Sequence, residues 1–258
     1  MVVIGIIAVL MVLIVPALTS RKTAGDITNA ASAVAEALER ARTFAIANNT
    51  YSWIGFFEED VTSTATPHPR AAGVGRIVIS IVASKDGTRY KDSNVDTSNP
   101  HAFYPPPAPS PLAATDTNAA VLTQVGKLTR IENSHLAQLA SAVPARATVG
   151  SDYQLAATEF TLHPSTPTGN PPTAGPPVTN PTTFNYPLSA SSTTADYTFT
   201  RIIEFNPRGE ALKIVDLPTP LMEIGLRPTH GNVVDNNSAN IVAIQLTGGT
   251  GKARSYRP

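Results

Sequence analysis

The residues of this chain that could carry chemistry are few and lie far apart. Its five histidines stand at His68, His101, His135, His163 and His230. No two of them have the spacing of a metal-binding pair, and the chain contains no cysteine that could complete a zinc site. It also has no Gly-x-Ser-x-Gly motif for a serine hydrolase. We therefore predict that the protein is not an enzyme and holds neither a metal ion nor a cofactor.

Two further stretches resemble ligand sites at first sight. Glu58, Glu59 and Asp60 follow an apolar segment, and we interpret them as a solvated turn because no calcium-binding spacing follows them. The stretch Gly248–Lys252 lacks both the earlier glycine and the later Ser or Thr of a phosphate-binding loop, and no helix follows it. We interpret it as a glycine turn between two strands.

Three cations lie in the last seven residues: Lys252, Arg254 and Arg257. On a strand Lys252 and Arg254 share a face, and the simplest interpretation is a closing strand with solvated cations. The whole chain carries 19 basic and 19 acidic residues, so its formal net charge is zero. This balance excludes a highly basic nucleic-acid binder, although it permits a local basic patch.

The element that begins the chain is unusually apolar. Residues 1–18, MVVIGIIAVLMVLIVPAL, contain no charged or polar side chain. As a helix they would be about 27 Å long, close to the ~30 Å hydrocarbon core of a bilayer. A buried core helix would carry a polar edge, and a cleaved signal peptide would have a basic start and an Ala-x-Ala site. A plain membrane anchor and a helix that later packs against its own copies both remain open.

The helical pattern continues through residues 19–50. An apolar stripe recurs there at spacings of three and four, over Ile27, Ala30, Ala31, Val34, Leu38, Ala41 and Ala45. Asp26 could cap a new helical section and Asn48 and Asn49 are good terminators, so we expect one long helix or two nearly collinear ones. A one-sided helix suits packing on a globular head, which a simple anchor does not need. Pro16 is either a tolerated kink or a point where the helix bends on leaving lipid.

From residue 51 onward the apolar period changes to two, which predicts strands. We expect one short helix over 133–142, and the longest alternating run, 196–205, should place Tyr197, Phe199, Ile203 and Phe205 on one side. Two proline-rich segments, about 99–112 and 164–187, are expected to be surface loops, because proline cannot donate a ladder hydrogen bond. The predicted strands are 51–57, 76–82, 158–162, 196–205, 211–215, 221–226, 241–246 and 252–256.

These elements predict an α+β fold of 258 residues. A long N-terminal α-helix, apolar and then amphipathic, packs on an antiparallel β-sheet head formed by residues 51–258, with proline-rich loop insertions. Successive strands without alternating helices favour antiparallel pairing over a parallel α/β sheet.

The apolar segment VVIGIIAVLMVLIVPAL resembles the N-terminal region of type IV pilins and type II secretion pseudopilins, with Pro16 where that family has its helix-kinking proline. IIEFNPRGEALKI, residues 202–214, resembles the strand–turn–strand of the GspH/FimT-type head. NIVAIQLTGGTGKARSYRP, from Asn240 onward, resembles its closing strands. The family's leader, phenylalanine and assembly glutamate are missing, so the sequence is expected to begin about six residues inside the mature protein.

The resemblance implies a structural subunit of a type IV pilus-like or type II secretion filament. Its partners would be copies of itself and other pilins, after a stage in the bacterial inner membrane with a periplasmic head. The filament core would be lined by Ile4, Ile6, Ile7, Val9, Leu10, Val12, Leu13 and Ile14. Arg21 and Lys22 run against this orientation, since positive charges favour the cytoplasmic side.

Two alternatives remain open. A DNA-binding minor pilin is suggested because Gly251-Lys252-Ala253-Arg254 approximates the glycine-arginine-x-arginine stretch with which resembling minor pilins bind DNA. Lysine replaces the first arginine, and a neutral chain attracts DNA weakly, so we expect DNA to be the less favoured partner. A singly membrane-anchored surface binding protein is the second alternative.

Overall fold

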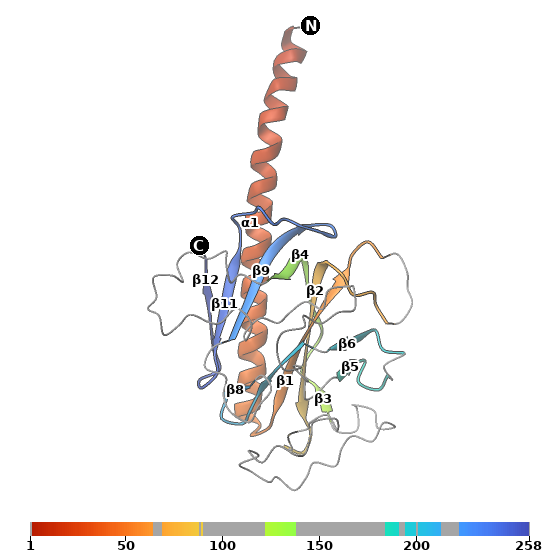
Figure 1. Cartoon of the computed structure of the whole chain (residues 1–258), viewed down its shortest axis with the longest axis vertical. Helices are drawn as coiled ribbons and strands as arrows, with labels where there is room; N and C mark the ends of the chain where they lie inside the picture. Colours follow the sequence, from red (N-terminus) through yellow and green to blue (C-terminus); the bar gives the residue numbers. More distant parts are fainter. Residues whose placement is uncertain are drawn as a thin grey trace, which may run out of the picture.

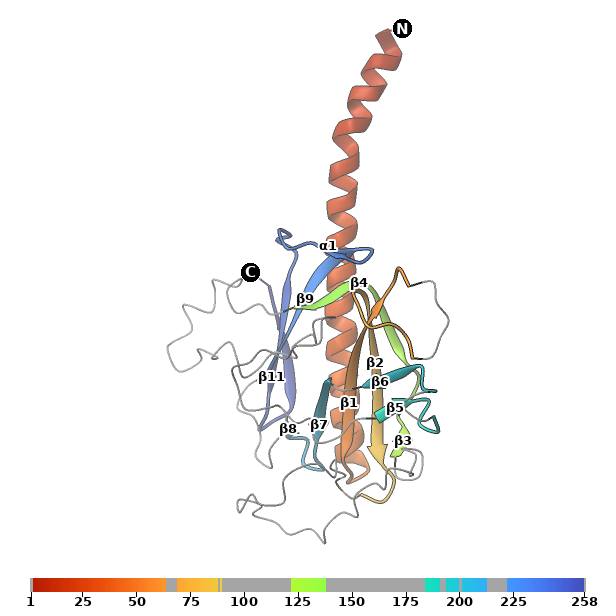
Figure 2. The same cartoon turned by 45° about the vertical axis from the view of Figure 1, so that its right-hand side comes forward.

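The computed structural model describes residues 2–63, 69–87, 89, 122–137, 184–190, 194–199, 201–212 and 222–257, and within the N-terminal helix it describes side chains from residue 24 onward. One helix, α1 (Val2–Ala47), lies against a curled antiparallel sheet. Figures 1 and 2 show the sheet around the C-terminal half of α1, while the N-terminal half extends away from it. The predicted α+β fold is confirmed.

Among the described residues, ten strands form the main sheet, in the order β12-β11-β9-β4-β2-β1-β7-β8, with β10 beside β9 and β3 beside β2. Their bounds are β1 (Ser52–Asp60), β2 (Gly75–Ser84), β3 (Leu122–Gln124), β4 (Thr129–Ala137), β7 (Arg201–Phe205), β8 (Ala211–Leu212), β9 (Met222–His230), β10 (Val233–Val234), β11 (Val242–Thr247) and β12 (Lys252–Tyr256). A separate hairpin consists of β5 (Phe184–Tyr186) and β6 (Tyr197–Phe199).

The helix is continuous, so one long helix replaces the alternative of two. Asp26 does not cap a new section, because it lies within the helix, and its carboxylate accepts a hydrogen bond from Asn133 Nδ2 at 3.2 Å. The C-terminal end agrees with the sequence. Asn49 has a φ of +48°, and the amide of Thr50 returns to the carbonyl of Ala45 at 3.0 Å.

The predicted apolar stripe of α1 is the face that packs on the sheet. Every member from Ile27 to Ala45 is buried in one cluster with side chains of β1, β2, β7, β9 and β11. Five of the buried helix positions are alanines, so the backbone of α1 can approach the strands closely. Over the part of α1 whose side chains the structure describes, no segment is long and apolar enough to cross a membrane.

The opposite face of the sheet has its own core, covered by the β5–β6 hairpin. Phe184 and Phe199 stack there with ring centroids 5.0 Å apart. They lie directly over Gly55 of β1, where an added Cβ would come within 2.7 Å of Phe184 Cζ and of Phe199 Cβ. Trp53 and Tyr197 are buried in the same cluster, which we call the outer cluster.

The prediction of one strand over 196–205 is wrong. The chain changes partners after Phe199, because β6 pairs with β5 whereas β7 pairs with β1. Tyr197 and Phe199 therefore belong to the outer cluster, while Ile203 and Phe205 face the helix. Apolar residues stand at odd positions both before and after the change, so the sequence pattern did not reveal the new partner strand.

The prediction of a helix over 133–142 is also wrong, because β4 extends through Ala137; residues 138–142 lie outside the described part. Asn133 has a φ of +56° and forms a bulge opposite β2, where Glu132 pairs with Arg76 and Ser134 pairs with Gly75. The extra residue shifts the alternation, so Ile131 and Leu136 face the same cluster although five positions separate them. Because the bulge interrupts the two-residue period of apolar side chains in β4, the sequence pattern resembled that of a helix.

The other predicted strands that fall on described residues are confirmed with small changes in their ends. The strand over 158–162, residues 213–215 of the strand over 211–215, the loop over 99–112 and residues 164–183 of the second loop lie outside the described residues. The end of the predicted loop 164–187 is corrected, since Phe184–Tyr186 forms β5. The Gly248–Lys252 stretch is a turn between β11 and β12, as predicted, with Gly251 at a φ of +62°.

Candidate functional site

The C-terminal strand β12 is the last strand at one end of the sheet order, paired with β11. Ala253 packs against the helix-facing cluster, so alternation places Lys252, Arg254 and Tyr256 on the outer face. All three are exposed, and the shared face predicted for Lys252 and Arg254 follows from this strand. Arg257 does not join them, because its guanidinium donates a hydrogen bond to the Thr28 hydroxyl on α1.

The start of β12 is fixed by two touching turns and one helix side chain. Arg42 of α1 donates from Nε to the carbonyl of Thr250 at 2.8 Å. The amide of Ala211 reaches the carbonyl of Gly248 at 2.7 Å, which joins the β7–β8 turn to the β11–β12 turn. A Cβ on Gly251 would lie 2.0 Å from the carbonyl oxygen of Gly209, so only glycine fits there. The cations of β12 therefore project from a rigid base.

The interpretation of residues 58–60 as a solvated turn is wrong for its first two members. Glu58 and Glu59 are buried within β1, only 6% and 5% exposed. Strand alternation sends Glu59 to the outer face and Glu58 to the face that carries Phe56. Asp60 ends the strand and accepts hydrogen bonds from Thr62, which lower the pKa of its carboxyl.

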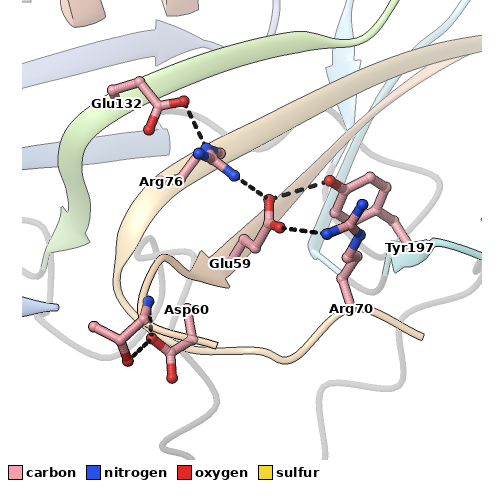
Figure 3. Close-up of polar contacts among 7 residues, drawn as sticks. Glu59, Asp60, Arg70, Arg76, Glu132 and Tyr197 are labelled. Carbon is pink, nitrogen blue, oxygen red and sulfur yellow. Dashed lines mark hydrogen bonds and ion pairs between the residues drawn. The ribbon is translucent and has the colours of Figure 1, made fainter. Parts of the chain in front are cut away.

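Glu59 is the centre of an ion network on the outer face (Figure 3). Its Oε2 accepts hydrogen bonds from Arg76 Nη1 and Tyr197 Oη, each at 3.1 Å, and Arg70 Nη1 lies 3.7 Å from Oε1. Arg76 continues to Glu132 at 2.6 Å. Burial raises the pKa of Tyr197, the Glu59 charge adds to that rise, and Arg130 opposes it. The network links β6 and β4 to β1 and β2.

Glu58 forms a second network on the other face. Its Oε1 lies 2.7 Å from His135 Nδ1 and accepts the amide of Leu136 at 2.8 Å, while Arg201 Nη1 donates to Oε2 at 2.8 Å. Burial raises the pKa of this carboxyl, but His135 and Arg201 together outweigh it and hold the pKa below its ordinary range. Both oxygens are engaged, so the carboxylate stabilises the join of β1, β4 and β7 and is not free to act as a base.

Sequence reasoning missed these networks for a definite reason. Glu58 meets partners 77 and 143 positions away, and Glu59 meets Tyr197 across 138 positions. Only Glu-Glu directly after an apolar strand gave a local signal, and that pattern equally describes a solvated turn. Within the described ranges, no three His, Cys, Asp or Glu side chains gather as a metal site would require.

The predicted filament-core residues, from Ile4 to Ile14 with Pro16, lie where the structure describes backbone but not side chains. The backbone there is helical throughout, including at Pro16. Comparison of the chain with protein-family models, with curated proteins and with solved structures found no match.

Proposed function

We propose that this chain is a pilin-like or pseudopilin-like structural subunit, which assembles through the N-terminal half of α1 into a type IV pilus-like or type II secretion filament. The observation that carries the proposal is the division of one 46-residue helix. Its C-terminal half buries one face on the sheet, whereas its N-terminal half extends away from the head (Figure 1) and has a purely apolar sequence up to Leu18.

The proposed mechanism is an exchange of apolar surroundings. An exposed apolar rod of this length is costly in water, so it is held first in the inner membrane, with the head in the periplasm. In the filament, apolar flanks of neighbouring subunits replace the lipid. Because both surroundings are apolar, the net transfer free energy is small, and packing and polar contacts between subunits decide assembly.

A charge in the middle of the apolar segment tests this proposal. Leu10→Arg in the natural full-length protein should abolish filaments in negative-stain images and reduce membrane retention in fractionation. The matched control is Ser189→Arg, which adds the same charge on an exposed turn of the head and should leave both unchanged. Normal filaments from Leu10→Arg would overturn the proposal, and wild-type protein that stays solitary in the membrane would favour a singly anchored binding protein.

A second candidate function, binding of DNA by a minor pilin, is favoured by the outer face of β12. Two cations and a tyrosine are exposed there at every second position, and this order suits phosphate contacts beside a stacking ring. The Lys252→Ala/Arg254→Ala double variant should then lose binding to single- and double-stranded DNA, and wild-type affinity should fall steeply with salt. A DNA affinity that changes neither with salt concentration nor in the double variant would exclude this candidate.

A further inference from the structure

The large exposed apolar side chains of the head lie at different levels along the axis of α1. In the part of the chain that the structure describes, three large apolar side chains are exposed: Val233 at 63%, Tyr256 at 43% and Ile46 at 43%. Ile46 lies at the C-terminal end of α1. Tyr256 is next to Arg257, which reaches Thr28 near the point where the helix leaves the sheet. Val233, the most exposed of the three, belongs to none of the buried clusters.

The turn that carries Val233 points toward the N-terminal half of the helix. Strand β9 passes Ser134 of β4 at Pro228, and the neighbouring Asn133 is bonded to Asp26 of α1. The strand then continues to His230, which pairs with Val233 on β10. Figure 1 shows the loops that follow β9 at the end of the sheet from which α1 emerges.

The height of Val233 along the helix follows from standard dimensions. Two strand residues beyond Pro228 advance up to about 7 Å, so Val233 lies about that far past the level of Asp26. Leu18, the last residue of the apolar segment, lies eight helical residues from Asp26, or about 12 Å. Val233 thus comes within about 5 Å of the level at which the apolar segment ends, which is inside a headgroup layer of about 5–8 Å.

We infer that this turn, residues 230–237, rests on the phospholipid headgroup layer of the membrane in which α1 is held before assembly, with Val233 inserted among the headgroups. This inference depends on the proposed function, because it takes residues 1–18 as the membrane segment. It adds a second contact between the subunit and the lipid, made by the head.

The chemistry of the turn fits headgroups without requiring a particular lipid charge. Its tip is uncharged, with Gly231 and Asn232 before Val233 and with Asn236 and Asn237 after it. His230 Nε2 lies 3.9 Å from Asp235 Oδ2. These two ionisable side chains of the turn favour lipid surfaces of opposite charge. Uncharged amides keep hydrogen bonds with water or headgroups alike, and a single valine adds a modest apolar gain. Contact should therefore form on zwitterionic as well as anionic membranes, and the guanidinium of Arg227, which donates to the carbonyl of Asn236 at 2.7 Å, adds attraction to anionic headgroups.

Because the chain has no cysteine, single nitroxide labels can be placed without background. The experiment compares Val233→Cys, Ile46→Cys and Leu10→Cys in the full-length protein, reconstituted in phosphatidylcholine vesicles with and without phosphatidylglycerol. Nickel chelated to lipid headgroups reports headgroup proximity, and oxygen reports immersion in hydrocarbon. Ile46 is the matched control, since it is also exposed but lies about 30 Å along the helix from Asp26.

We expect headgroup nickel to relax the label at 233 at least about fivefold more than the label at 46, in both vesicle types. Oxygen should reach the label at position 10. Equal relaxation at 233 and 46, with position 10 in hydrocarbon, would overturn this inference alone, and the turn would then be free to contact a neighbouring subunit. A label at position 10 outside hydrocarbon would overturn the proposed membrane stage together with it.

Discussion

The two faces of the main sheet are covered by opposite kinds of element. The inner face receives a long helix that is adjacent to β1 in sequence and contributes mainly alanines. The outer face receives a short hairpin from far along the chain that contributes large aromatic rings. The difference shows that a long regular element can cover a large core with small side chains, whereas two three-residue strands cover a smaller core with bulky rings.

The largest expected effect on the unfolding free energy is a difference between the Glu58 and Glu59 networks, which lie on opposite faces of the sheet. Arg201→Met leaves the buried Glu58 carboxylate without its guanidinium, and the loss should be about 3–5 kcal/mol of unfolding free energy. Arg70→Met on the outer face should cost less than about 1 kcal/mol, because Arg70 is partly exposed and Glu59 keeps two other donors. Urea denaturation in detergent micelles, followed by Trp53 fluorescence, measures both. Equal losses would contradict the contrast between a buried triad and a redundant network.

The next effect tests the inner core. Leu38 is fully buried at the middle of the helix–sheet interface, so Leu38→Ala should cost about 2–5 kcal/mol by lost transfer energy and a residual cavity. Glu36→Ala, on the exposed side of the same helix, should change the unfolding free energy by less than about 0.5 kcal/mol. Should the two variants prove equally stable, the helix could not be the cover of the inner face.

A smaller effect tests the outer core. Gly55→Ala places a methyl group within 2.7 Å of Phe184 and Phe199, so overpacking should cost about 1–3 kcal/mol. Gly25→Ala is the matched control, because nothing lies within 4 Å of its Cβ and alanine favours the helix by up to about 1 kcal/mol. Thermal unfolding should rank Gly25→Ala above wild type and Gly55→Ala below it. A neutral Gly55→Ala would mean that the hairpin is not seated on β1.

The smallest effect is a dependence on pH. The folded pKa of Glu58 is depressed from its ordinary value of 4.5, so its stabilising contribution is present above that value and is lost as the pH falls through the folded pKa. Unfolding free energy should therefore decline below about pH 4.5. Glu58→Gln should flatten part of this decline, while Asp60, whose pKa is also lowered, retains its share. An unchanged slope in Glu58→Gln would contradict the assignment.

The same contrast between faces explains how far the sequence could predict the fold. The stripe from Ile27 to Ala45 repeats locally, so both the helix and its buried side followed from spacing. The bulge at Asn133 depends on pairing with β2, and the break between β6 and β7 depends on the pairing of β7 with β1, which lies far earlier in the chain. Neither leaves a local signal, because a period of two does not tell which sheet a residue joins.

The candidate site divides in the same way. The exposed cations Lys252 and Arg254 could be placed from the alternation of the last strand alone. Arg257 could not, because its partner Thr28 lies 229 positions earlier. The carboxylate networks of Glu58 and Glu59 were missed for the same reason, since each is assembled from strands that meet only in the folded head.

The bond between Thr28 and Arg257 joins the first element of the head to the last residues of the chain. The chain must therefore be synthesised through Arg257 before this head can close. Until then, the growing chain exposes the helix stripe and the open side of β11, and contacts so distant in sequence form slowly. Chaperones that bind exposed apolar surface would therefore meet this chain before its closing strand β12 has been made.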